Sequence, residues 1–161
     1  MIATILPIDS PLNCLHFVTS VKMLNPGECP LASQNANAKK LLLIDPEDDL
    51  REVIQTSLEL TTSWEIVTAR SYTRGIALAE AQQPHAILLN VERLDVDRRA
   101  ILTQLKTNPI ARSIPVILMT ERVRLADWWQ LTQLGVAGAI SKPFDCASLG
   151  RQIAVFLKWA I

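Results

Sequence analysis

The sequence contains few residues of the types that build disulfide frameworks, zinc sites and hydrolytic triads. It has 3 cysteines and 2 histidines in 161 residues, and no pair of cysteines has the C-x-x-C spacing of a metal-binding knuckle. An odd number of cysteines argues against a disulfide-stabilised fold. With so few histidines, a catalytic triad or a zinc-activated water is not expected, and the composition gives no sign of a metal centre.

The sequence also lacks an excess of charge of one sign, and it lacks long apolar runs. The 16 basic residues balance the 16 acidic ones, so the basic excess that favours nucleic-acid binding is absent. No apolar run approaches the roughly 18 residues that a membrane-spanning helix requires. The first residues carry no basic flank and no small-residue cleavage site, so they do not resemble a signal peptide. We therefore expect a cytoplasmic protein with neither nucleic acid nor membrane as a partner.

The chain divides at about residue 39. Residues 1–39 contain Pro7, Pro11, Pro26 and Pro30 and then a polar stretch, without sustained periodicity. Such a segment buries too little apolar surface to offset the entropy of ordering it, so we predict a largely disordered N-terminal extension. From residue 40 to residue 161 the pattern is regular, and we predict one folded domain there.

Residues 40–161 alternate short apolar runs with amphipathic stretches. The runs predict strands at residues 40–44, 64–68, 85–90, 115–120 and 137–141, and the stretches between and after them predict helices. In the first helix we expect Val53 on the inward stripe and Asp49 with Glu52 as a capping pair at its start. Strands alternating with helices predict an α/β domain, a (βα)₅ doubly wound five-stranded parallel sheet.

Polar residues follow several of these strands. They are Asp45 after the first, Asn90 at the end of the third, Thr120 at the end of the fourth and Lys142 after the fifth. In open parallel sheets, ligands bind beyond the carboxyl ends of the strands, where the strand order reverses. The predicted functional site is therefore at this edge of the sheet.

These residues and their flanking segments resemble the receiver domain of bacterial response regulators. The resemblance rests on the sequences LLLIDPEDDLR (41–51), AILLN (86–90), IPVILMT (114–120) and LGVAGAISKPF (134–144), and it extends over residues 40–161. It implies the flavodoxin-like receiver fold. In that family an acidic pair binds Mg²⁺, an aspartate after the third strand accepts a phosphoryl group from a histidine kinase, and a hydroxyl and a lysine bind the phosphoryl oxygens.

Two of the positions that carry this chemistry are changed. Asp45 matches the first acid, but Pro46 occupies the place of the second and Asn90 that of the phosphoacceptor, while Thr120 and Lys142 are retained. A carboxamide is neutral and cannot form an acyl phosphate. Hard cations also bind poorly without anionic oxygens, so we expect no metal site, or Mg²⁺ binding that is lost or weak. We expect Lys142 to pair with Asp45 or Asn90 in a degenerate phosphoacceptor pocket.

The resulting hypothesis is a pseudo-receiver, a receiver fold without aspartyl phosphorylation. It is a stand-alone, non-enzymatic signalling protein in a two-component or phosphorelay pathway that acts through protein–protein contact. A histidine kinase or another receiver is the expected kind of partner, and a homodimer is left open. The alternative is an active phosphoacceptor receiver that uses a displaced acid, Glu92 or Asp95.

The adjacent tryptophans of the predicted fourth helix are candidates for a partner contact. Neighbouring helical residues point about 100° apart, so one ring can face the core while the other faces solvent. The spacing with Leu125 and Thr132 favours Trp129 as the inward ring. That choice leaves Trp128 and Leu131 near the surface as the candidate contact residues.

Overall fold

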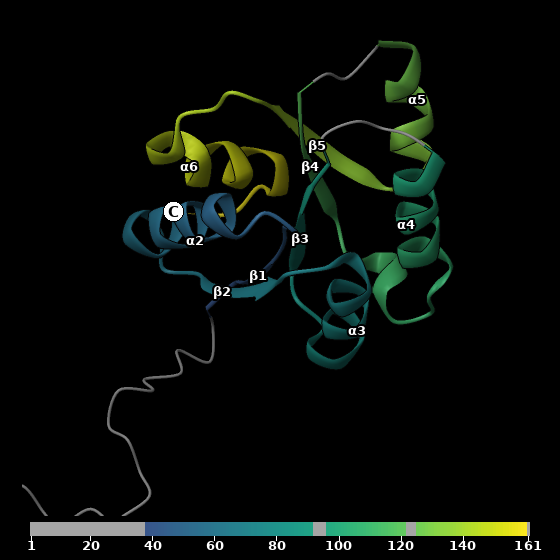
Figure 1. Cartoon of the computed structure of the whole chain (residues 1–161), viewed down its shortest axis with the longest axis horizontal. Helices are drawn as coiled ribbons and strands as arrows, with labels where there is room; N and C mark the ends of the chain where they lie inside the picture. The colour runs from purple at the N-terminus through teal and green to yellow at the C-terminus, as the bar shows by residue number, and fades with distance from the viewer. Residues whose placement is uncertain (1–37, 92–95, 122–124, 161) are drawn as a thin grey trace, which may run out of the picture. The chain divides into compact units, whose positions relative to one another are not determined.

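The computed structural model describes residues 38–91, 96–121 and 125–160, where strands and helices alternate (Figure 1). Each predicted strand is present within one residue of its expected bounds. The elements are β1 Lys40–Ile44, α2 Asp48–Thr61, β2 Glu65–Ala69, α3 Tyr72–Gln82, β3 Ala86–Asn90, α4 Val96–Thr107, η1 Ala111–Ser113, β4 Val116–Thr120, α5 Leu125–Gln133, β5 Val136–Ser141 and α6 Cys146–Leu157.

The strands form one parallel sheet of 5 strands in the order β2-β1-β3-β4-β5. Helices α2 and α6 cover one face, and α3, α4 and α5 cover the other (Figure 1). The chain moves outward from β1 to β2 and then returns to the other side of β1 for β3. This reversal confirms the predicted doubly wound fold and puts the topological switch point at the carboxyl ends of β1 and β3.

Both faces of the central strands are buried, which explains their continuous apolar runs. Leu41 and Leu43 of β1 pack with α2 and α6, whereas Leu42 and Ile44 pack with the helices of the opposite face. All of β3 and β4 is buried. Side chains alternate between the faces of a strand, so a sheet covered on both sides requires apolar residues at successive positions.

The capping residues predicted from the sequence are confirmed only in part. Ser71 accepts a hydrogen bond from the Arg74 backbone N–H at the start of α3, and Asp145 caps α6 in the same way. The prediction of Asp49 as a cap is wrong, because the N-cap of α2 is Glu47, two residues earlier, and it makes no side-chain capping bond. The tight turn after β1, rather than a capping box, sets the start of this helix.

Val53 also differs from its prediction. Its side chain is 52% exposed, while Ile54 and Leu58 of the same helix are fully buried. Residues one position apart on a helix differ by about 100° in direction, so the stripe through Ile54 and Leu58 turns Val53 outward. The exposed side of α2 therefore carries apolar surface that the core does not use.

The predicted disorder of residues 1–39 concerns a segment of which only the last two residues are described, so it stays a prediction. Within the described ranges, none of the helices is both long and apolar enough to cross a membrane.

Candidate functional site at the carboxyl ends of the strands

Backbone hydrogen bonds bring the candidate residues to one edge of the sheet. The Asp45 N–H donates to the Ala69 carbonyl at 3.0 Å, which ties the end of β1 to β2. At the carboxyl ends of β4 and β5, the Lys142 N–H donates to the Thr120 carbonyl at 2.9 Å. Asp45, Asn90 and Thr120 are buried and Lys142 is half-buried. The sheet thus places all four residues where the sequence predicted them.

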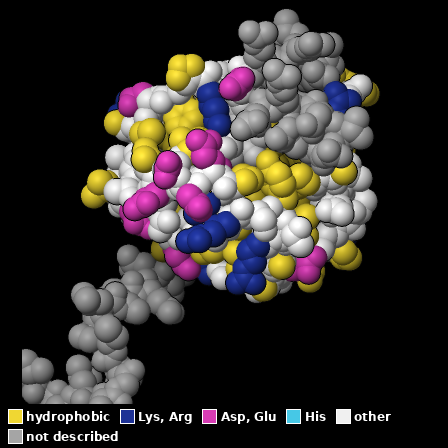
Figure 2. All heavy atoms as spheres, viewed as in Figure 1, with side chains coloured by type: hydrophobic (Ala, Val, Ile, Leu, Met, Phe, Trp, Pro, Cys, Tyr) yellow, Lys and Arg dark blue, Asp and Glu magenta, His cyan; other side chains and the backbone are white. Residues whose placement is uncertain are grey.

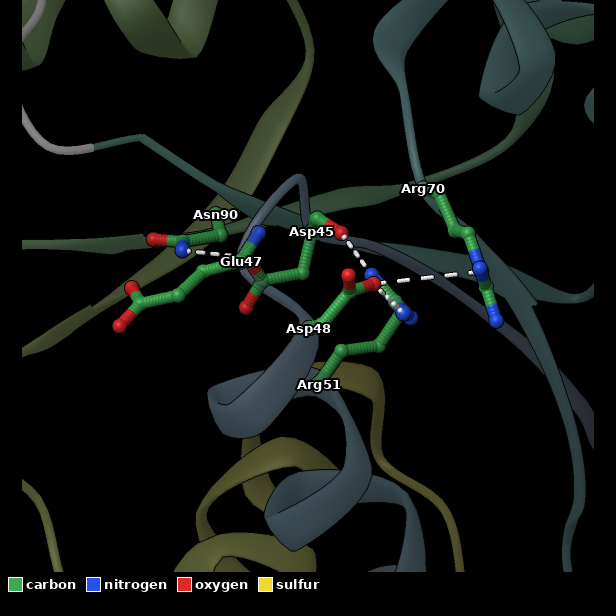
Figure 3. A network of polar contacts seen from close by, with 6 residues as sticks. All are labelled: Asp45, Glu47, Asp48, Arg51, Arg70 and Asn90. Carbon is green, nitrogen blue, oxygen red and sulfur yellow. Dashed lines mark hydrogen bonds and ion pairs between the residues drawn. The ribbon is translucent and has the colours of Figure 1, made fainter.

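A buried hydrogen bond joins the two central residues of the site (Figure 3). The Asn90 carboxamide Nδ2 donates to Asp45 Oδ1 at 2.8 Å, and the Glu47 backbone N–H donates to the same oxygen at 2.9 Å. The carboxylate fixes the orientation of the amide, because a flipped amide would set an oxygen acceptor against Asp45 Oδ1. A neutral donor therefore stabilises the one carboxylate without adding a second negative charge.

Two oxygens of this pair have no hydrogen-bond partner within the described part of the chain: Asp45 Oδ2 and Asn90 Oδ1. One carries anionic charge and the other is neutral, while Pro46 offers no side-chain ligand atom. Receivers hold Mg²⁺ with clustered carboxylates, and the described residues contain no group of three or more His, Cys, Asp or Glu placed to hold a metal. Among the described residues, a single carboxylate and a neutral amide oxygen do not fit the magnesium ion that the receiver fold implies.

Lys142 does not make the contact that the sequence predicted. Among the described side chains, Asp45 Oδ2 and Asn90 Oδ1 accept no hydrogen bond, and the ion pairs of Lys40 with Glu65 and of Asp48 with Arg51 and Arg70 do not involve Lys142. The expected link from Lys142 to Asp45 or Asn90 is wrong, because the Asn90 carboxamide takes the place beside the carboxylate. Lys142 instead lines a separate surface hollow of about 570 Å³ with Glu121 and Phe144.

A buried arginine fixes the loop that carries Asp45. Arg51 is 7% exposed, and its Nη1 donates to the Asp45 backbone carbonyl at 2.9 Å. Its Nη2 hydrogen-bonds and ion-pairs with the Asp48 carboxylate, on which Arg70 also converges (Figure 3). The hydrogen bond and the charge of Arg51 lower the pKa of Asp48 below its ordinary value of 3.8. The turn after β1 is thus held by its own charged residues.

The single tyrosine of the chain contacts the site from the other side. Tyr72, the first residue of α3, donates its hydroxyl hydrogen to the Asn90 backbone carbonyl at 3.1 Å. Its ring packs against the core cluster under α3 and α4. The end of β3 is consequently held at its side chain by Asp45 and at its carbonyl by Tyr72.

The remaining predicted residues divide into those that the structure describes and those that it does not. Thr120 is fully buried at the end of β4, and Ile140 of β5 is 2% exposed, with no aromatic ring at that position. Glu92 and Asp95, the alternative acceptor acids, lie outside the described residues.

The orientation predicted for the tryptophans of α5 is wrong. Trp129 is 69% exposed, Leu131 is 2% exposed, and Trp128 packs against the core cluster under α4 and α5. Trp128 and Leu131 do share a face, as predicted, but that face is the inner one. The stripe that we predicted to face inward included Thr132. Its hydroxyl donates a hydrogen bond to the Trp129 carbonyl on the exposed side of α5.

Arg51 and Tyr72 were missed by the sequence interpretation, although each leaves a signal. Arg51 is three residues before Ile54 and seven before Leu58, on the buried stripe of α2, and three residues after an acid. A basic residue at such a position is expected to pair inside the fold. Tyr72 directly follows the capping serine, where its side chain lies close to the ends of the strands.

Comparison with known proteins identifies the family of the chain. Residues 41–154 match the family model described as the response regulator receiver domain. The probable transcriptional regulator ycf27 of Cyanophora paradoxa is 26% identical over 122 residues, which is 76% of this chain and 49% of that protein. The response regulator Rre1 of Synechocystis sp. is 30% identical over 105 residues, which is 65% of this chain and 46% of that protein.

Solved structures show the same fold. The chemotaxis protein CheY4 of Vibrio cholerae aligns with a TM-score of 0.65 at 17% identity, covering 74% of this chain and 98% of that one. By contrast, the chain spans about half the length of the curated relatives that it matches.

Proposed function

The chain belongs to the response regulator receiver domain family, and because Asn90 stands at the place of the phosphoacceptor aspartate, we propose that it is a pseudo-receiver that signals without aspartyl phosphorylation. Receiver domains are the signalling modules of two-component systems. This one keeps the fold and the hydroxyl and lysine positions but lacks the acceptor carboxylate. Its contribution to a signalling pathway is then contact with another protein, and it is not an enzyme.

One observation carries the proposal: the carboxamide of Asn90 is committed to a buried hydrogen bond with Asp45. Phosphoryl transfer to a receiver needs a nucleophilic carboxylate and a cation that offsets the negative charge of the phosphoryl oxygens. An amide oxygen provides no such nucleophile, and its nitrogen already stabilises the neighbouring carboxylate. The pocket therefore holds one carboxylate that an internal hydrogen bond stabilises, and we expect Mg²⁺ binding to be lost or weak.

The decisive experiment is phosphorylation with a small-molecule donor. The purified protein is incubated with acetyl phosphate and Mg²⁺, and its intact mass is measured. We expect no adduct, and a stoichiometric gain of about 80 Da, one phosphoryl group, would refute the proposal. The matched control is the double variant Pro46→Asp, Asn90→Asp, which restores both family carboxylates and is expected to gain that mass.

The alternative, an active receiver that uses Glu92 or Asp95, predicts a different result in the same assay. The wild-type protein would gain the phosphoryl mass, and Glu92→Gln or Asp95→Asn would abolish the gain. Mg²⁺ would also raise the melting temperature of the wild-type protein. No adduct and no Mg²⁺-dependent stabilisation together exclude this alternative.

The proposed partners are signalling proteins, a histidine kinase or another receiver among them. Contact without phosphorylation requires a recognition surface that is present in the unmodified state. A pull-down with the wild-type protein and with Trp129→Ala tests whether the exposed ring of α5 contributes to that surface. Loss of the recovered partner in the variant would assign the contact to this helix.

A further inference from the structure

Helices α3 and α4 are neighbours on one face of the sheet, and a pocket of about 650 Å³ lies between them (Figure 1). Its lining residues recur every three or four positions along each helix, a spacing that places them on one side of that helix. They include Tyr72, Ile76 and Glu80 on α3, Ile101 and Gln104 on α4, and Asn108 just after α4. The volume is that of a pocket that holds a small molecule.

One end of the pocket is apolar. The side chains of Tyr72, Ile76 and Ile101 are half-buried and pack against the core cluster beneath the two helices. Tyr72 and Ile76 are one helical turn apart, so the ring and the aliphatic side chain are neighbours on α3. An aromatic ring beside aliphatic side chains forms a surface that a flat apolar group can cover.

The other end of the pocket carries the charge. Of the described residues that line it, Glu80 alone is charged, and its side chain is exposed. The amide nitrogen of Asn108 donates a hydrogen bond to the Glu80 carboxylate. The amide oxygen of Asn108 accepts the backbone N–H groups of Ile110 and Ala111 at 2.9 and 3.1 Å, which fixes the orientation of the amide. Within the described ranges, none of the ion pairs includes Glu80.

The two ends are far enough apart for one ligand to contact both. Tyr72 and Glu80 are two turns from each other on α3, and at 1.5 Å per residue this separation is about 12 Å along the helix. A ligand with an apolar body and a polar group at one end therefore matches the pocket better than a ligand that is apolar throughout.

Tyr72 contacts both the pocket and the functional pair. Its hydroxyl donates to the Asn90 backbone carbonyl at 3.1 Å, whereas Asp45 and Asn90 themselves do not line the pocket. Tyr72 is also the single tyrosine of the sequence. A spectroscopic label on tyrosine consequently reports on this pocket and on no other part of the chain.

We propose that this pocket binds a small cationic ligand, with a flat apolar body on Tyr72, Ile76 and Ile101 and one protonated amine at Glu80. The Glu80 carboxylate attracts the ammonium group and repels an anion of the same size. Because the Asn108 amide already holds the carboxylate, less side-chain freedom is lost when the ligand binds. This site goes beyond the proposed function, since its occupation requires neither phosphorylation nor the Asp45–Asn90 pair.

Three indole compounds that differ in one group test the proposal: tryptamine carries an amine, tryptophol a hydroxyl and indole-3-acetate a carboxylate. The full-length protein, with fluorotyrosine at its single tyrosine, is titrated with each compound, and the shift of the fluorine NMR resonance gives the dissociation constant. We expect tryptamine to bind about fivefold more tightly than tryptophol, as one partly exposed ion pair provides. Indole-3-acetate is expected to bind most weakly.

A charge variant distinguishes Glu80 from the other acids of the protein. Acidic side chains gather over α2 on the opposite side of the sheet (Figure 2), and they attract an amine by charge alone. Glu80→Gln is expected to remove the preference for tryptamine over tryptophol. Glu59→Gln is the matched control, because Glu59 of α2 is also an exposed acid that accepts a hydrogen bond from an amide, that of Gln55 at 2.8 Å. We expect Glu59→Gln to keep the preference.

A second pair of variants tests the pocket itself. Ala77 is exposed and lines the pocket, so Ala77→Trp is expected to fill it and to weaken tryptamine at least about tenfold. Ala147→Trp is its control, since Ala147 is an exposed alanine of α6 that does not line this pocket. Both positions are on helix surfaces, where a larger side chain leaves the core unchanged.

Equal affinities for the three compounds, or a preference for tryptamine that survives Glu80→Gln, would overturn the proposal. A fluorine resonance that none of the compounds shifts at millimolar concentration would overturn it as well. Equal losses in Ala77→Trp and Ala147→Trp would show that the compounds adhere elsewhere. None of these measurements uses a phosphoryl donor, so their outcome is independent of the acetyl phosphate result.

Discussion

Replacing Asn90 with aspartate tests most directly whether the Asn90 amide stabilises the Asp45 carboxylate. The change removes the donor that lies 2.8 Å from Asp45 Oδ1 and puts a second carboxylate in its place, at a residue that is 4% exposed. Loss of a hydrogen bond to a charged acceptor costs about 1.5 to 3 kcal/mol. Two charges about 4 Å apart at an effective dielectric of 20 repel by about 4 kcal/mol. Since the side chains relax, we expect a net loss of about 3 to 5 kcal/mol at pH 7.

The pH dependence of this loss has a definite sign. Mutual repulsion raises the apparent pKa of the carboxylate pair in the folded variant above the ordinary value of about 3.9 in the unfolded chain. Between those two pKa values the folded variant binds more protons than the unfolded one, so its stability rises as the pH falls. The deficit relative to the wild-type protein is therefore largest at neutral pH and shrinks toward pH 4.

Urea denaturation at pH 7 and pH 5, with and without millimolar Mg²⁺, measures these effects. A loss of this size lowers the midpoint by about 2 M urea. Mg²⁺ is expected to stabilise Asn90→Asp and to leave the wild-type protein unchanged. A variant as stable as the wild-type protein at pH 7 without Mg²⁺ would refute the assignment of Asn90 as the hydrogen-bond donor that stabilises Asp45.

Asn108 supplies a matched control for this prediction. Its amide nitrogen also donates to a carboxylate, that of Glu80, but the contact is exposed to solvent. Asn108→Asp makes the same chemical change where water screens the repulsion, so we expect a loss of about 1 kcal/mol or less. Similar losses at the two positions would mean that burial of the Asp45 pair does not matter.

Three further substitutions test particular features of the fold by urea or thermal denaturation. Gly135 has φ +71°, a left-handed conformation that disfavours a Cβ atom, so Gly135→Ala is expected to cost about 1 to 2 kcal/mol. Trp128→Ala is expected to cost about 2 kcal/mol because its ring packs on the core, and Trp129→Ala to stay within about 0.5 kcal/mol; the reverse order would contradict the orientation of α5. Arg51 stabilises the ionised form of Asp48, a contribution that is present above pH 3.8 and is lost as the pH falls below it. The stability difference between the wild-type protein and Asp48→Asn should accordingly close at acid pH, and a constant difference would refute the pairing.

The fold was predictable because burial on both faces leaves a strong pattern. The runs at β1, β3 and β4 are apolar at successive positions, and only a parallel sheet covered on both sides explains such runs beside helical stripes. The strand bounds were therefore correct to within one residue. Helix faces were less certain: Val53 and Trp129 are apolar residues on exposed sides, and their hydrophobicity alone favoured the core.

The candidate site was predictable in its residues but not in its contacts. Strand ends follow from the apolar runs, so Asp45, Asn90, Thr120 and Lys142 could be assigned to one edge. The hydrogen-bond partner of the Asp45 side chain depends on distances between side chains at the ends of different strands. No local sequence pattern encodes these distances. From the sequence we predicted Lys142 as the partner, because its charge is opposite to that of Asp45. In the structure the Asn90 carboxamide is the hydrogen-bond partner instead.

The backbone explains why the fold tolerates an asparagine at position 90, where the family has its phosphoacceptor aspartate. The bonds that tie the strand ends together, such as those from the Asp45 and Lys142 amides, use main-chain atoms and do not depend on the side chains that changed. In an active receiver, neighbouring carboxylates repel one another unless a cation offsets their charge, so the site contributes strain when empty. Here the Asn90 amide replaces that repulsion by an attraction, and Tyr72 and Arg51 hold the backbone carbonyls on either side. In the proposed function, the residue that replaces the nucleophile also replaces the charge-balancing role of the metal, because its amide donates a hydrogen bond to the remaining carboxylate.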